Sequence, residues 1–173
     1  MTAQIVHVLR DAQRVCVRPA RPTDGLGIQD FVRRLSAATR WARFFAQIRE
    51  LAPAALARLT SGGRGSVFVA ETRDGCIVAL AEYAAGEDAG SCEVALVVAD
   101  AWQGRGLGYL LMDRLLQSAR AAGIERAIVD ILCGNDAMLA VARRYDFAAA
   151  RSPHGSTMRR LVLELRGAAL AAA

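Results

Sequence analysis

The residues best suited to chemistry lie at positions 103–108, where the sequence reads QGRGLG. The apolar residues 92–98 before them predict a strand, and the residues after them, up to 122, predict an amphipathic helix. Glycine lets the backbone turn tightly and leaves its amide groups open to a ligand. The first amides of a helix have no partner within it, and the positive end of the helix dipole attracts anions. The segment therefore predicts a phosphate site, most simply for a pyrophosphate.

Three alternatives explain this segment less well. A dinucleotide fingerprint has its third glycine where Tyr109 stands and an acidic residue about 20 positions further on. Asp130 lies near that distance, but inside the apolar run AIVDIL. A P-loop has Gly-Lys followed by Ser or Thr, and the chain contains no lysine. A plain surface turn would not need three glycines at a helix start, where they lower helix propensity.

Composition limits the class of protein. With 173 residues, of which 54% are hydrophobic, the chain is long enough for one domain with a sizeable core. No apolar run approaches the roughly 20 residues of a membrane span, and the first residues lack the apolar region of a signal peptide. A cytoplasmic protein without a membrane partner is therefore expected. The net charge is +5 and the 22 basic residues are all arginine; they are scattered, without interleaved aromatic residues, which favours a polyanionic small ligand over nucleic acid.

The cysteines give no sign of a metal site or a disulfide framework. The four are widely spaced, form no C-x-x-C pair and stand in apolar runs: Cys16, Cys76, Cys92 and Cys133. Buried free thiols are expected. Since the chain has only two histidines, no histidine-rich metal site is expected either.

Periodicity and turn residues predict the elements that position the glycine segment. Strands are expected at 15–18, 67–71, 76–83, 92–98, 127–133, 147–150 and 157–165, with a short extra strand within 5–9. Helices are expected at 23–37, 36–48, after Pro53, at 106–122, and from 135 or 136 to 144. The aromatic residues of the second helix, Trp41, Phe44 and Phe45, are expected in the core. The alternation predicts a mixed sheet flanked by helices, in a single domain over residues 1–173 with a core at about 14–166.

The pattern Gln103-x-x-Gly106-x-Gly108 after such a strand resembles motif A of the GNAT family of N-acetyltransferases, and the order of elements is similar over nearly the whole chain. The resemblance implies an α/β (α+β) fold with a mixed, mostly antiparallel central sheet flanked by helices. It also implies that this sheet is splayed between the strands before and after the motif A helix. In that family the glycine loop holds the pyrophosphate of acetyl-coenzyme A, and the pantetheine arm enters the splay. Residues 135–138 and 143–147 are similar to motif B, in which Asp146 replaces the usual glycine; Asp tolerates a left-handed backbone better than most residues. The implied cofactor-binding residues are Val97, Val98, Gln103, Gly104, Arg105, Gly106, Leu107, Gly108, Asn135 and Arg143.

The resemblance implies acetyl transfer to a primary amine by direct attack. Related protein acetyltransferases use a glutamate at the place of Glu93 as general base; the alternative is a solvent-facing residue at a sheet end. Ala142 stands where many members have a tyrosine that protonates the thiolate, so the general acid is not identified, and Tyr145 is expected to pack in the core. Glu82 and Asp130 either bind a substrate ammonium or pair with arginine. His154 is expected in a surface loop.

The acceptor is the least determined part of the prediction. Residues 18–45 and the segment APAALARLT are similar to bacterial protein-lysine acetyltransferases that modify acyl-CoA synthetases, which implies a protein lysine as acceptor. Four arginines of this region, Arg40, Arg43, Arg49 and Arg58, are candidates for contact with an acidic protein surface. Other acceptors are a polyamine, an aminoglycoside or an amino acid. A non-catalytic acyl-CoA-binding or sensor module and a nicotinamide-dependent oxidoreductase are the alternatives from other classes, and the oligomeric state is open.

Overall fold

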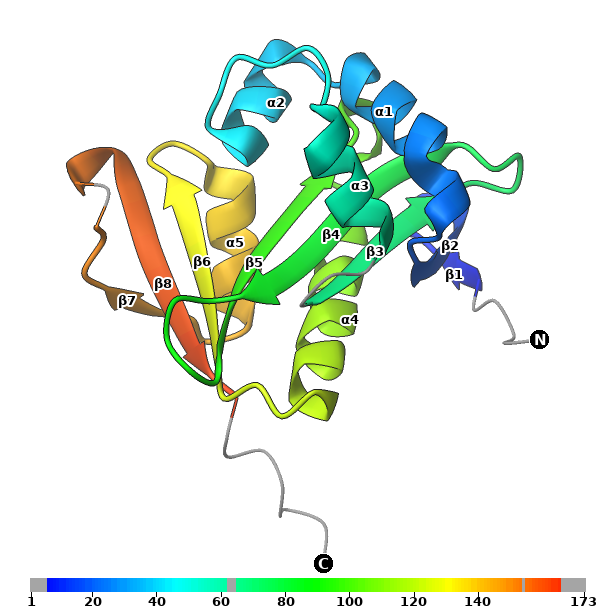
Figure 1. Cartoon of the computed structure of the whole chain (residues 1–173). Helices are drawn as coiled ribbons and strands as arrows, with labels where there is room; N and C mark the ends of the chain where they lie inside the picture. The colour runs from blue at the N-terminus through cyan, green and yellow to red at the C-terminus, as the bar shows by residue number, and fades with distance from the viewer. Residues whose placement is uncertain (1–5, 62–64, 154, 166–173) are drawn as a thin grey trace, which may run out of the picture.

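Eight strands form one mixed sheet in the order β1-β2-β3-β4-β5-β6-β8-β7 (Figure 1). The structure is a computed structural model that describes residues 6–61, 65–153 and 155–165. The predicted loop at His154 and both ends of the predicted domain lie outside these ranges. The strands are β1 (Val6–Val8), β2 (Arg14–Pro19), β3 (Gly65–Glu71), β4 (Ile77–Ala85), β5 (Ser91–Val98), β6 (Arg126–Leu132), β7 (Ala148–Ala150) and β8 (Met158–Glu164).

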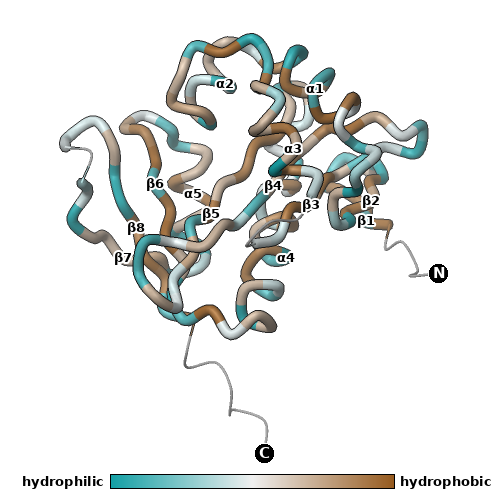
Figure 2. Tube along the Cα trace, viewed as in Figure 1, coloured by the Kyte–Doolittle hydropathy of each residue, from teal (hydrophilic) through white to brown (hydrophobic). Residues whose placement is uncertain are grey.

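Helices cover both faces of the sheet, as predicted. They are α1 (Gly25–Arg34), α2 (Ala37–Phe44), α3 (Pro53–Ser61), α4 (Leu107–Ala121) and α5 (Asp136–Arg144), with short 3-10 turns η1 (Pro22–Asp24), η2 (Asp100–Trp102) and η3 (Gly155–Thr157). On one face, α1 to α3 bury Ile28 and Phe31 against Val69 and Leu80. On the other face, α4 and α5 bury a larger core against the same strands and β6. Figure 2 shows brown, apolar stretches along β5 and β6 and a hydrophilic turn between β3 and β4.

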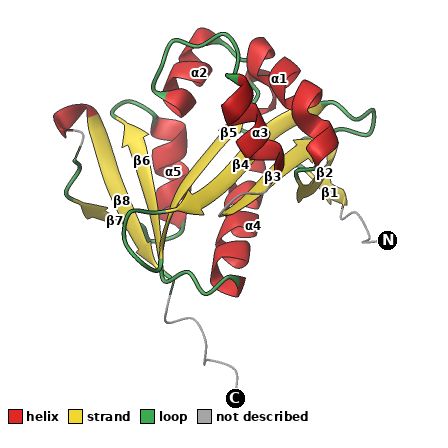
Figure 3. Ribbon diagram, viewed as in Figure 1, coloured by secondary structure: helices red, strands yellow, loops and turns green. Residues whose placement is uncertain are grey.

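The sheet is splayed in the middle. β5 and β6 run parallel and pair over only three residues, Ser91–Glu93 with Arg126–Ile128. β5 then continues to Val98 and β6 to Leu132 without a partner on the facing edge, and Figure 3 shows the two strands diverging from their common end. Every other pair among the described strands is antiparallel. The predicted fold class and the predicted position of the splay are confirmed.

The helix α2 differs from its prediction. It ends at Phe44 rather than near residue 48, and Phe45 follows in a left-handed conformation with a φ of 54°. The prediction that the aromatic residues of α2 lie in the core was wrong for two of them, because Trp41 is 46% and Phe45 is 40% exposed. The physical reason is that α2 buries none of its residues completely. Only Phe44 packs partly against the core of α1 and α3.

The cysteine prediction was correct for half of the thiols. Cys16 and Cys92 are buried, whereas Cys76 is partly exposed and Cys133 is exposed. Cys133 lies just beyond the end of β6, where the chain leaves the sheet, so an apolar neighbourhood in the sequence does not bury it. Among the described residues, no group of three potential ligands is placed to hold a metal ion. No described helix has the length and apolar character needed to cross a bilayer.

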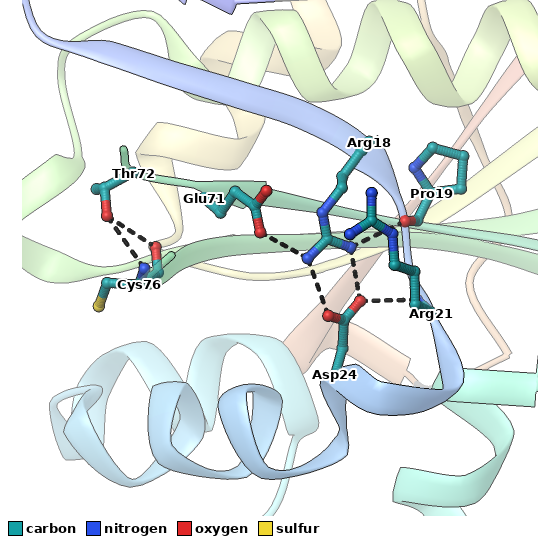
Figure 4. A network of polar contacts seen from close by, with 7 residues as sticks. All are labelled: Arg18, Pro19, Arg21, Asp24, Glu71, Thr72 and Cys76. Atoms are coloured by element: carbon teal, nitrogen blue, oxygen red, sulfur yellow. Dashed lines mark hydrogen bonds and ion pairs between the residues drawn. The ribbon is translucent and has the colours of Figure 1, made fainter. Parts of the chain in front are cut away.

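A buried arginine joins β2 and β3 to the start of α1. Arg18 binds both carboxylate oxygens of Asp24, at 2.7 and 2.9 Å, and Glu71 at 2.6 Å (Figure 4). Asp24 also accepts a hydrogen bond from the backbone N–H of Arg21 at 2.7 Å. Arg18 and Asp24 are 7% and 8% exposed. Although burial opposes its ionisation, the hydrogen bonds from Arg18 hold the pKa of Asp24 below its ordinary value.

We expect Arg18→Ala to lower the free energy of unfolding at neutral pH by about 3–5 kcal/mol, because it leaves buried carboxylates without their partner. The depressed pKa of Asp24 sets the pH dependence. Its contribution is present above about pH 4 and is lost as the pH falls through the lower pKa of the folded state. Urea unfolding curves should therefore show a difference between the two proteins that shrinks on acidification. Arg33→Ala, at the exposed Arg33–Glu50 pair, is the control and should change little; equal effects of both substitutions would contradict the prediction.

Candidate active site

The glycine segment forms the loop that leads into α4. Gly104 and Gly106 have φ values of 73° and 93°, in the left-handed region that favours glycine. Gly106 is the N-cap of α4 and provides no side chain to cap it, so the first amides of the helix stay open to a ligand. A Cβ at Gly108 would lie 3.4 Å from Val141 Cγ2, which shows how closely α4 and α5 pack. The loop thus has the geometry predicted for a phosphate site.

The side chains within this segment hold the loop in place. Gln103 Nε2 donates to the carbonyl oxygen of Val98 at 3.0 Å, which ties the loop to the end of β5. Arg105 forms an ion pair with Asp11, and its guanidinium lies 5.2 Å from the ring centroid of Trp102. Since both side chains are occupied, backbone amides are the groups that the loop itself offers to a phosphate.

The separation from β6 leaves one edge of β5 open. The N–H of Ala99 donates to the carbonyl of Val78 at 2.9 Å, so the odd-numbered residues of β5 direct their backbone groups to β4. Leu96 and Val98 direct theirs to the other side, beyond the last residues that pair with β6. Of these groups, the carbonyl of Val98 is bound by Gln103. The alternation favours Val98 over Val97 as a backbone partner for a ligand in the splay, since Val97 faces β4 and packs its side chain under α1 to α3.

A cavity of about 430 Å³ lies at this splay. Its wall is formed by residues on or next to six elements, namely α2, α3, β4, β5, β6 and α5. These residues are Ala42, Arg43, Phe45, Arg58, Glu82, Ala84, Glu93, Val94, Ala95, Leu96, Ile128, Val129, Asp130, Asn135 and Met138. The structure thus brings Glu93 and Asn135 together. The Asn135 side-chain oxygen also caps α5 through the N–H of Met138, at 3.1 Å. Arg143 does not line this cavity; it is exposed two residues after Val141, on the helix that borders the glycine loop.

Three carboxylates border the cavity, and two of them are neutralised. Glu82 is buried and forms ion pairs with Arg43 and Arg58; burial opposes its ionisation, but the arginines outweigh it and lower the pKa of Glu82. Asp130 binds Arg160 on β8 at 3.0 and 2.7 Å. Glu93 is exposed and forms no hydrogen bond or ion pair with another described residue. It stands opposite Ile128 at the last position where β5 and β6 pair.

The ion pairs of Glu82 involve two of the four arginines that were candidates for contact with an acidic protein surface. Arg43 is buried against Glu82, so the prediction that it contacts an acidic partner was wrong. Arg40 donates to the carbonyl of Leu35, which also occupies its guanidinium. Arg58 remains 53% exposed at the cavity. The physical reason is that Glu82, a buried carboxylate, draws arginines from two helices to compensate its charge.

Asp100, which no pattern in the sequence singles out, holds α2 beside β5. Asp100 accepts hydrogen bonds from the N–H of Ser36 at 2.9 Å, from its hydroxyl at 2.6 Å and from the hydroxyl of Thr39 at 2.7 Å. Ser36 is the N-cap of α2. Asp100 therefore positions the helix that carries Arg43 and Phe45 to the cavity. Ser36 is of a type that often caps helices, but the sequence does not show that Asp100, 64 residues further along the chain, binds it.

The structure offers no tyrosine at the place expected for a general acid. Ala142 is fully buried, and the hydroxyl of Tyr145 donates to Asp113 at 2.7 Å and to the carbonyl of Tyr109 at 2.9 Å. Burial, together with Asp113, raises the pKa of Tyr145. This tyrosine packs against the core of α4, which confirms its predicted structural role. Asp146 has a φ of 59°, so the turn survives the replacement of glycine.

Comparison with known proteins adds an independent line of observation. Residues 33–147 match the family model described as the acetyltransferase (GNAT) family. Acetyltransferase PA5475 of Pseudomonas aeruginosa is 36% identical over 157 residues, which cover 88% of this chain and 84% of the relative. The GNAT domain of S. lividans PAT superposes with a TM-score of 0.84 at 28% identity, over 93% of this chain and 96% of that one. YncA of Salmonella typhimurium, a putative acetyltransferase solved with its cofactor acetyl-CoA, shares the fold, with a TM-score of 0.73 at 22% identity over 92% and 98% of the chains.

Proposed function

We propose that this chain, which belongs to the acetyltransferase (GNAT) family, transfers the acetyl group of acetyl-coenzyme A to a lysine side chain of another protein. The observation that carries the proposal is the position of Glu93. It is the cavity carboxylate that forms no hydrogen bond or ion pair with another described residue, and it stands where β5 and β6 separate. An acetyl donor bound in the splay and an amine approaching Glu93 would therefore meet in one cavity.

The donor side of the site suits coenzyme A. The amides of the glycine loop and the start of α4 bind the pyrophosphate. The pantetheine arm, which contains amide groups, adds to the open edge of β5 as an extra strand would, with Leu96 and Val98 as backbone partners. Asn135 and Met138 border the same cavity from the start of α5. The N–H of Val98, which faces the gap, would donate to the thioester carbonyl.

The reaction is a direct attack in a ternary complex. A lysine amine has an unperturbed pKa of about 10.4 and must lose a proton before it attacks; Glu93, directly or through a water, accepts that proton. The neutral nitrogen adds to the thioester carbon, the oxyanion forms at the carbonyl oxygen, and the carbon–sulfur bond then breaks. The leaving thiol has a pKa near 8.5, so it departs without a dedicated general acid. No cysteine lines the cavity, which favours direct attack over a covalent acyl-enzyme.

Two features of the acceptor side favour a protein over a small amine. In Figures 1 and 3, α1 to α3 lie over the half of the sheet up to β5, and none of the described helices α1 to α5 lies in front of β6 and β8. Glu93, which is exposed at the end of the β5–β6 pairing, is thus open to a large partner. Next to it, Trp41 of α2 and Phe45, which directly follows α2, are exposed, and Phe45 borders the cavity; aromatic residues are enriched at protein interfaces.

Glu93→Gln keeps the shape of the side chain and removes its basicity. We expect turnover at neutral pH to fall by roughly 10² to 10⁴, the usual contribution of a general base, while affinity for acetyl-coenzyme A changes little. Steady-state release of coenzyme A with a fixed acceptor measures the rate, and calorimetry measures donor binding. Glu164→Gln, a change at an exposed strand glutamate outside the cavity, is the matched control. Wild-type turnover in Glu93→Gln would show that this residue is structural.

The acceptor class is tested by direct competition. Labelled acetyl-coenzyme A is offered in parallel with an acyl-CoA synthetase, a polyamine and an aminoglycoside. We expect label on lysine residues of the protein at a higher kcat/KM than on either small amine, because the accessible face beside Glu93 admits a protein surface. A much higher kcat/KM for a small amine would overturn the protein acceptor while leaving acetyl transfer intact.

A further inference from the structure

The turn between β1 and β2 lies against the glycine loop, although nearly a hundred residues separate them in the sequence. The N–H of Arg10 donates to the carbonyl of Arg105 at 3.4 Å. The next residue of the turn, Asp11, forms the ion pair with Arg105. The turn itself is closed by a hydrogen bond from the N–H of Leu9 to the carbonyl of Gln13, at 2.8 Å. Two contacts of different kinds therefore hold the turn and the loop together.

The side chain of Arg10 reaches Gly106 at the N-terminus of α4. A Cβ built on Gly106 would lie 3.7 Å from Arg10 Nε and 3.9 Å from Arg10 Cγ. Gly106 is the N-cap of α4, so the guanidinium of Arg10 lies beside the open amides of the first turn. Arg10 is exposed and forms no side-chain hydrogen bond or ion pair with another described residue. Its charge is therefore available to a ligand at this place.

We propose that Arg10 binds the pyrophosphate of coenzyme A and so completes, from the turn between β1 and β2, the phosphate site of the glycine loop. This inference rests on the proposed function, because it requires that coenzyme A binds at the loop. A guanidinium offers a planar set of donors that matches phosphate oxygens, and a charged hydrogen bond is stronger than a neutral one. The loop amides and Arg10 then contact the same group from two sides.

The pair between Asp11 and Arg105 acts as a positioning device for Arg10. Asp11 is the carboxylate adjacent to Arg10, and an ion pair between the two would cancel the charge offered to the phosphate. Arg105 occupies Asp11 instead, while Trp102 supports the Arg105 guanidinium from its ring face. Arg105, a predicted cofactor-binding residue, thus contributes through its backbone and through the turn that it anchors.

Calorimetry with coenzyme A and with dephospho-coenzyme A, which keeps the pyrophosphate and lacks the 3′-phosphate, tests the proposal. We expect Arg10→Ala to weaken binding of both ligands by about tenfold or more, or about 1.4 kcal/mol, and added salt to reduce this difference. Arg10→Lys, which keeps the charge, should recover part of the affinity. Arg120→Ala, at the far end of α4, removes the same charge and should bind as the wild type does. Melting temperatures of all variants check that they fold.

The outcomes of this experiment distinguish a failure of the Arg10 proposal from a failure of the proposed function. A loss for coenzyme A alone would place Arg10 at the 3′-phosphate and overturn the pyrophosphate contact. Unchanged affinity of Arg10→Ala for both ligands would overturn any role of Arg10 in binding, and the proposed function would stand. Failure of the wild type to bind coenzyme A would overturn the proposed function and this inference together.

Discussion

Directly after Glu93, β5 remains paired with β4 but no longer with β6, because β6 pairs with only three residues of β5 and then diverges. Backbone N–H and C=O groups inside a sheet are costly to bury unless another group satisfies them. The open backbone groups of Leu96 and the open N–H of Val98 therefore form an edge that a ligand with amide groups can complete. The cavity, the candidate base and the glycine loop all lie around this edge, so the position of the separation determines the position of the candidate site.

Polar contacts from outside the sheet keep that geometry fixed. Gln103 binds the last carbonyl of β5 and thereby links the splay to the glycine loop. Asp100 fixes the start of α2 beside the end of the same strand. Glu82 on β4 forms ion pairs with Arg43 of α2 and Arg58 of α3, which link both helices to the sheet. Together these contacts hold α2 and α3 in place relative to the splay and the glycine loop.

The sequence predicted the features that local patterns encode. The order of strands and helices followed from periodicity, and the tight loop into α4 followed from the glycines at 104, 106 and 108, two of which have positive φ values. The splay followed from family resemblance. Exposure of Trp41 and Cys133 could not be predicted, because burial depends on which elements cover a residue and α2 lies at the margin of the core. Arg10 was missed for a similar reason, since its contact with Gly106 arises only when the first strands and α4 come together.

Residue-resolved amide hydrogen exchange along β5, measured by NMR with and without coenzyme A, tests the central claim most directly. In the free protein we expect the amides of Leu96 and Val98 to exchange faster than those of Ala95 and Val97, which face β4. Addition of coenzyme A should protect Leu96 and Val98 selectively, because the pantetheine arm completes the open edge. Equal protection of both pairs in the free protein, or unchanged exchange at Leu96 and Val98 with coenzyme A bound, would contradict the claim that the splayed edge of β5 is the binding surface.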